Sequence, residues 1–359
     1  MKHKPLVLAA ALAATAGLAQ AQSSVTLFGL VDANVTRYRA GSQSGSPSDI
    51  ALNDGTTNGL NGSRWGLRVS EDLGGGLKVG VLLEGGLSLA NGTALQGGRS
   101  FGRQSYLSLG GSVGELRVGR QYILSDGVLG QSNPYGNALT LNPGTGVTNV
   151  GKALPFFLNA PRVDGALTYI SPTLAGFQFS AQITDATATY DRFHGLKLQY
   201  ADGPLYAALT HEWNTSRKTD DSVNQSTTLA MNYNVGAFKL LGGLQRNRDL
   251  ALGSGNGAFT GANLSVTGSA GTFVADRSDG WTLGAEVPMG PWLFGGNYTV
   301  VKYAAAGGAS QNLGKFALGA RYGLSKSSFL YTSASTATGD LKDHIAQRSA
   351  MQLGMRTAF

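Results

Sequence analysis

Apolar and polar residues alternate at every second position along most of this chain. In the segment that begins at position 64, Trp65, Leu67 and Val69 lie on one face of an extended chain, and Arg64 and Arg68 lie on the other. The same alternation recurs in segments 24–31, 162–169, 177–183, 196–200, 281–285 and 351–359. A period of two predicts β-strands with one apolar and one polar face.

The connections between these segments form a short set and a long set that alternate along the chain. Seven tight turns are expected at 73–76, 110–114, 172–176, 201–204, 235–237, 288–291 and 324–327. Eight polar loops are expected at 40–61, 90–98, 124–161, 187–192, 216–224, 249–276, 304–311 and 339–346. This alternation gives sixteen strands. It predicts an all-β fold, a 16-stranded antiparallel transmembrane β-barrel with short periplasmic turns and long extracellular loops. A soluble β-sandwich is the alternative.

Composition narrows the class further. Charged residues make up 14% of the chain, there are 53 glycines, and there is no cysteine. The mean hydropathy of −0.05 is too polar for a bundle of membrane-spanning helices. After the first twenty residues, no stretch approaches the roughly 18 consecutive apolar positions that such a helix needs. A closed sheet can still cross hydrocarbon, because every backbone N–H and C=O in it is paired.

The start of the chain has the pattern of a secretory signal peptide. Lys2 and Lys4 form a basic start, residues 6–18 are apolar, and an Ala-Gln-Ala cleavage site follows at 19–21. The apolar run is short for a membrane anchor, which is the alternative. We expect residues 1–21 to be a signal peptide and residues 22–359 to form the barrel.

The end of the chain carries a second export feature. Phe359 is the final residue, and Leu353, Met355 and Thr357 share its face at a spacing of two. This resembles the C-terminal strand by which the barrel-assembly machinery recognises outer-membrane barrels. The resemblance assigns Phe359 to an assembly signal.

Several sequence segments together resemble one family. They are residues 23–32, 63–74, 101–104, 119–122, 162–164 and 169–173. In combination they look like the Gram-negative general porins of the β-proteobacterial type. The resemblance implies a homotrimer in the cell outer membrane whose long third loop, here about 124–161, folds into the lumen. It also implies passive diffusion of small hydrophilic solutes and no catalysis.

The resemblance also suggests a basic wall at the narrowest part of the lumen. Arg64, Arg103 and Arg162 match the family's ladder of wall arginines. The alternation independently puts Arg64 and Arg162 on the polar side, and Arg68 shares the face of Arg64. Arg103 is ambiguous, because its face of the strand also carries leucines. Arg120 shares its face of the strand with Leu116, Val118 and Tyr122, which favours a subunit contact.

The third loop is expected to carry little negative charge. The family's Pro-aromatic-Gly turn corresponds to residues 133–136, with a neutral Asn133 in front and Tyr135 as the aromatic residue. Within 124–161 the only acidic residue is Asp126, and Lys152 offsets it. Rings of arginine or lysine favour anions in a pore. We therefore expect a constriction that prefers anions.

Catalytic and ligand-binding patterns are weak. His194, His211 and His344 have no second ligand at metal-binding spacing, and we expect no metal, cofactor or catalytic residue. Basic residues do not cluster with aromatic ones, which argues against nucleic acid. Lipopolysaccharide is an expected partner, with Arg37 and Arg39 as contact candidates. A substrate-specific channel, and a barrel enzyme or adhesin, remain alternatives.

Overall fold

The structure is a computed structural model of the chain. The described residues are 23–41, 50–54, 59–135, 162–187, 189–251, 264–269, 271–345 and 347–359. The predicted signal segment 1–21, Lys152 and the rest of 136–161 lie outside them. In the described part, no helix is long and apolar enough to cross a membrane.

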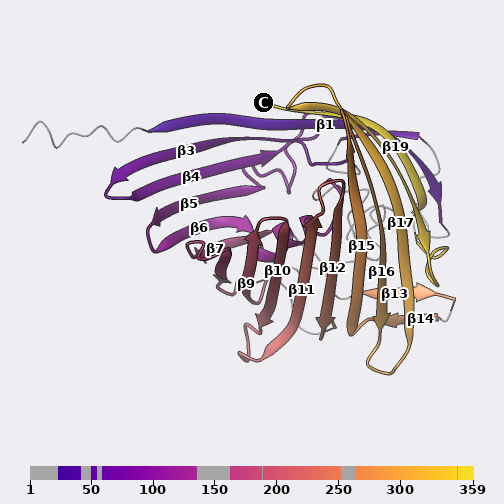
Figure 1. The fold of residues 1–359 in the computed structure, drawn as a ribbon. Coiled ribbons are helices and arrows are strands. Elements are labelled where there is room, and N and C mark those ends of the chain that lie inside the picture. The colour runs from indigo at the N-terminus through magenta and orange to yellow at the C-terminus, as the bar shows by residue number, and fades with distance from the viewer. Residues whose placement is uncertain are drawn as a thin grey trace, which may run out of the picture.

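The described residues form one large antiparallel sheet. Its strands are β1 (Ser24–Ala40), β2 (Ile50–Asp54), β3 (Arg64–Gly74), β4 (Leu77–Gly86), β5 (Gln104–Gly111), β6 (Gly114–Tyr122), β7 (Arg162–Ile170), β8 (Phe177–Thr184), β9 (Arg192–Asp202), β10 (Leu205–Thr215), β11 (Ser222–Asn234), β12 (Lys239–Arg248), β15 (Arg277–Met289), β16 (Trp292–Ala304), β17 (Ser310–Gly323), β18 (Ser328–Thr338) and β19 (Gln347–Ala358). Figure 1 shows them as a continuous curved sheet.

The sheet closes on itself between its first and last strands. β1 pairs with β19 from Leu30 opposite Ala358 onward. On the other edge of β1, β3 pairs with its first half and β2 with its second half. Because β2 and β3 pair one after the other along the same edge of β1, they occupy one position in the barrel. The seventeen strands of the sheet therefore make a closed 16-stranded barrel. The predicted fold class is confirmed.

The predicted connections need three corrections. Strand β2 forms within the predicted loop 40–61, because these residues find a free edge on β1. The predicted loop 124–161 begins with a short helix, α3 (Leu124–Gly130). The predicted loop 249–276 contains a hairpin of β13 (Ser265–Gly268) and β14 (Gly271–Val274), which lies beside the loop ends of β15–β17 in Figure 1.

The two faces of the wall differ in exposure as the alternation predicts. On β19, Met351 and Leu353 are each 65% exposed, whereas Gln352 between them is 4% exposed. Outward leucines and valines can contact lipid, and inward polar groups line the lumen. The near-zero hydropathy of the chain is therefore the average of one apolar face and one polar face.

The C-terminal residue is built into the closure of the barrel. The backbone N–H of Phe359 donates to the Gly29 carbonyl at 3.0 Å, and Gly29 N–H donates back at 2.9 Å. The Phe359 ring covers Gly29 so closely that a side chain there would collide with it. The aromatic ring remains largely exposed on the outer face.

Candidate pore constriction

The third loop enters the barrel as helix α3 and packs against the inner wall of β9–β11. The buried Glu212 of β10 holds its first turn, accepting from the Ser125 N–H at 2.9 Å and the Ser125 hydroxyl at 2.8 Å. Asp126, the acid expected in this loop, lies in the same turn. Glu212 therefore fixes the start of the loop against the wall.

The loop then follows the wall as far as β17. The amide of Asn232 on β11 donates to the Gln131 carbonyl at 3.1 Å. The Tyr135 N–H donates to Glu286 on β15, and its hydroxyl donates to the Leu293 carbonyl at 2.9 Å. These bonds hold Tyr135 with a positive φ of 61°, which is rare for a bulky residue. Burial raises the pKa of its hydroxyl.

Glycine makes the close approach between loop and wall possible. A Cβ on Gly295 of β16 would lie 2.8 Å from the Pro134 Cβ and 3.0 Å from the Tyr135 ring. Asn133 is buried, and its amide donates to the Leu129 carbonyl at 3.0 Å. Within the described part of the loop, Asn133 is thus a structural residue that stabilises the turn after α3.

On the other side of the lumen, three arginines converge on one carboxylate and one phenol. The Arg103 Nε donates to Glu84 at 2.6 Å, and its Nη2 donates to the Tyr122 hydroxyl at 2.6 Å. Arg162 donates to the same hydroxyl at 2.9 Å and lies 4.5 Å from the centre of the ring. Arg64 approaches Glu84 at 3.9 Å. We call these five residues the basic cluster.

The basic cluster has an excess of positive charge. It contains three guanidinium groups and one carboxylate, Glu84, and the Tyr122 hydroxyl accepts hydrogen bonds from two of the arginines. Arg64 Nε and Arg162 Nε are buried and have no hydrogen-bond partner among the described residues. Both residues are partly exposed as a whole, so their positive charge acts on the lumen.

The position of Arg103 explains why alternation could not place it. It lies just before β5, so strand periodicity does not govern its side chain. Its backbone N–H donates to the Glu84 carbonyl at 3.0 Å, which directs the side chain along the inner wall.

The predicted face of Tyr122 requires a correction. Its spacing of two from Arg120 predicts that both side chains lie on the same face of the strand. The register between β6 and β7 shifts between Gly119 and Gln121. This β-bulge brings Tyr122 into the lumen. Arg120 instead pairs with Asp164 and donates to the Gly102 carbonyl at 2.7 Å.

The remaining predicted residues lie outside the basic cluster. Arg68 lies on β3 four residues nearer the tight-turn end, with its guanidinium 5.2 Å from the Phe28 ring. Asp164 is half exposed and binds Arg99 at 2.8 Å. Asp164 thus pairs with Arg99 and Arg120, outside the basic cluster.

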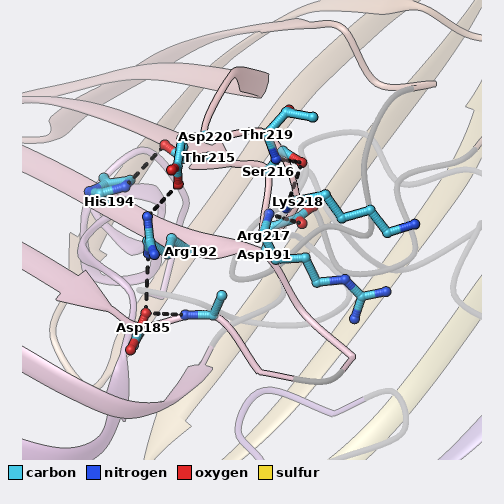
Figure 2. Close-up of polar contacts among 11 residues, drawn as sticks. Asp185, Asp191, Arg192, His194, Thr215, Ser216, Arg217, Lys218, Thr219 and Asp220 are labelled. Atoms are coloured by element: carbon cyan, nitrogen blue, oxygen red, sulfur yellow. Dashed lines mark hydrogen bonds and ion pairs between the residues drawn. The ribbon is translucent and has the colours of Figure 1, made fainter.

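The loops after β8 and β10 are joined at the loop end of the barrel. Figure 2 shows Arg192 between Asp185 and Asp220. The Arg192 Nε lies 3.1 Å from Asp185 Oδ1, and its Nη1 lies 2.6 Å from Asp220 Oδ1. The Arg217 N–H donates to Asp191 at 3.0 Å. A hydrogen bond from the Ala186 N–H and another from Arg192 hold the pKa of Asp185 below its usual value.

Sequence reasoning missed the four wall residues that organise the site. Glu84, Tyr122, Glu212 and Glu286 all lie on strands. The alternation could have placed Glu84 on the inner face near Arg64. Glu84 lies opposite Gly66 on the neighbouring strand, and Gly66 shares the face of Arg64. Nothing in the sequence indicates that Glu212 and Glu286 meet the third loop, since the partners are 87 and 151 positions apart.

A closed barrel with a long loop folded into a charged lumen defines the class of outer-membrane channels. The chain matches the family model of the Gram-negative porins over residues 8–342. It therefore belongs to the Gram-negative porin family, and it forms a diffusion channel in the outer membrane.

Individual relatives agree with this assignment. An outer membrane porin protein of Bordetella pertussis is 32% identical over 393 residues, covering 99% of this chain and 100% of the relative. Outer membrane porin protein 32 of Delftia acidovorans is 34% identical over 253 residues, covering 68% of this chain and 70% of the relative. The solved structure of an anion-selective porin from Comamonas acidovorans has a TM-score of 0.70 and 25% identity, covering 94% of this chain and 100% of that chain.

Proposed function

We propose that this channel passes small hydrophilic solutes and ions passively and prefers anions. The observation that carries the proposal is the basic cluster, which holds three arginines and only one carboxylate. Arg64 and Arg103 approach Glu84, and Arg162 donates to the Tyr122 hydroxyl. The likeness to a porin described as anion-selective supports it. In this proposal Arg64, Arg103 and Arg162 line the constriction, and Arg68 extends the basic wall toward the periplasm.

The physical basis is the field of fixed charges in a narrow, low-dielectric passage. A ring of arginines favours anions and repels cations. Walls of low dielectric constant focus the field and raise the local concentration of counter-ions. The partly exposed side chains of Arg64 and Arg162 can replace part of an anion's hydration shell. The hydrogen bonds to Glu84 and Tyr122 hold the cluster on the wall.

The remaining expectations belong to the same proposal. Residues 1–21 act as the signal peptide, residues 22–359 as the barrel, and 124–161 as the constriction loop with Asp126, Asn133, Tyr135 and Lys152. The chain assembles as a homotrimer through the barrel-assembly machinery, which reads Phe359, and contacts lipopolysaccharide. It carries out no catalysis and binds no cofactor or nucleic acid.

Reversal potentials across a salt gradient test the anion preference. The purified protein is reconstituted in a planar bilayer with KCl at tenfold different concentrations on the two sides. The proposal expects a potential whose sign corresponds to chloride passing faster than potassium. A sign that corresponds to cation preference would overturn it, and the absence of conductance would overturn the channel assignment as well.

A further inference from the structure

Besides the basic cluster, a pair of arginines faces the lumen nearer the tight-turn end of the barrel. Arg321 on β17 and Arg356 on β19 lie on either side of β18. Both are close to one aromatic ring, that of Phe329, at 5.0 and 5.4 Å from its centre. Both arginines lie on the inward face. Leu318, three positions before Arg321, and Met355, one position before Arg356, are exposed on the outward face. An odd separation along a strand places two side chains on opposite faces.

The donors of this pair are only partly used by the protein. The contacts with Phe329 hold the two guanidinium groups without using their N–H groups. The Nε of Arg356 is buried and has no hydrogen-bond partner among the described residues, whereas the two arginine residues as a whole are partly exposed. Two converging, partly exposed guanidinium groups are suited to bind an oxyanion through paired hydrogen bonds.

One acidic residue faces the pair, but its oxygens are already engaged. Asp32 of β1 lies opposite Arg356 in the sheet. Its carboxylate accepts from the Tyr331 hydroxyl and from the backbone N–H groups of Leu60 and Asn61, at 3.0 and 2.9 Å. Asp32 therefore serves to hold the end of the first loop, and the pair retains an excess of positive charge.

The pair also lies next to the inner end of the described third loop. The Arg321 guanidinium is 5.8 Å from the centre of the Tyr135 ring. Tyr135 packs with Leu60 of the first loop in one apolar cluster over β17 and β18. An ion that has passed the third loop toward the periplasm thus meets Arg321 and Arg356 next.

We propose that Arg321 and Arg356 form a second anion-binding step on the periplasmic side of the constriction, suited to a tetrahedral oxyanion. The inference rests on the proposed anion preference and adds a site to it. The basic cluster on β3–β7 selects by charge, whereas this pair binds through two guanidinium forks. It slows multivalent oxyanions on their way through while chloride passes.

Inorganic phosphate, added to one side of the bilayer, is the probe. Because the chain has no cysteine, a single K326C substitution in the β17–β18 turn can be tagged with an impermeant thiol reagent to show which compartment faces the turns. Phosphate on the turn side is expected to reduce the chloride current at lower concentration than phosphate on the loop side. The R321Q/R356Q variant is expected to need roughly tenfold more phosphate for the same block.

The control is K326Q, which removes one positive charge at the same end of the barrel from an exposed turn. Phosphate should block the K326Q channel at the same concentration as the channel of the unchanged protein. R321K/R356K keeps the charge but loses the paired forks, and an intermediate block is expected. Conductance of each variant shows that it has folded.

The proposal is overturned if R321Q/R356Q leaves the phosphate block unchanged, or if K326Q weakens it equally. A variant that gives no channels leaves the decision to the single substitutions R321Q and R356Q, each expected to weaken the block by a smaller factor. Failure of the anion preference itself is distinguishable, because it appears in the reversal potential of the unchanged protein without phosphate.

Discussion

Arg103 and Glu84 form a buried ion pair at 2.6 Å in the inner wall of the barrel. Glu84 is the one carboxylate of the basic cluster, so it both anchors Arg103 and cancels part of the positive field. The selectivity of the constriction therefore depends on an acid as well as on arginines. This relationship makes the first prediction.

Substitution E84Q should increase the preference for anions. The amide keeps a hydrogen-bond acceptor for Arg103 but removes the only negative charge from the basic cluster. The permeability ratio of chloride to potassium should rise about fivefold, since nearby unit charges interact by about 1 kcal/mol even in water and each 1.4 kcal/mol is a factor of ten. Reversal potentials measure it. A ratio that falls would contradict the assignment of Glu84 to the lumen field.

Substitution R64Q/R162Q should lower the anion preference several-fold. These two arginines lie in the basic cluster and have an Nε group without a partner in the described residues. R246Q is the matched control, because Arg246 is 71% exposed and pairs with Asp279. If R246Q changes the permeability ratio as much as the double substitution does, selectivity is a property of the total charge and not of the constriction.

Substitution Y122F should destabilise the barrel while leaving the charge of the lumen unchanged. The Tyr122 hydroxyl accepts from Arg103 and Arg162, and its loss leaves two partly buried donors without that acceptor. The cost should be about 1–3 kcal/mol. Urea unfolding measured by tryptophan fluorescence in detergent gives the free energy. The permeability ratio should change far less than in R64Q/R162Q.

Substitution G295A should push the third loop away from the wall and narrow the pore. The added Cβ would meet Pro134 and Tyr135 at 2.8 and 3.0 Å, and overpacking of this kind costs about 1–3 kcal/mol. Single-channel conductance should fall. G110A is the control, since the nearest atom to its added Cβ is 3.9 Å away. Equal conductance in the two variants would show that the loop does not set the pore width.

The junction of the loops that follow β8 and β10 should loosen in acid. The depressed pKa of Asp185 means that its ionised form is stabilised in the folded loop. This contribution is present above the unfolded pKa of about 3.9 and is lost as the pH falls through the lower folded value. Hydrogen exchange of residues 216–221, corrected for intrinsic rates, should increase as the pH falls below the unfolded value of about 3.9. In D185N the junction should be looser at pH 7 already.

The sequence by itself determined the class of this protein. The period of two and the alternation of tight turns with long loops predict a 16-stranded barrel. Strand parity also places Arg64 on the polar face, independently of the family resemblance. Parity works at Arg64 because a strand within a continuous ladder must send successive side chains to opposite faces.

Only the tertiary structure decided how the interior is organised. Arg103 lies before its strand and Tyr122 lies beyond a bulge, so at both positions the period of two fails. Glu212 and Glu286 meet the third loop because barrel closure brings distant strands around it. Arg321 and Arg356 share one ring because β18 lies between them. Local sequence pattern fixes the face of a residue, whereas contacts across a lumen depend on how all sixteen strands close.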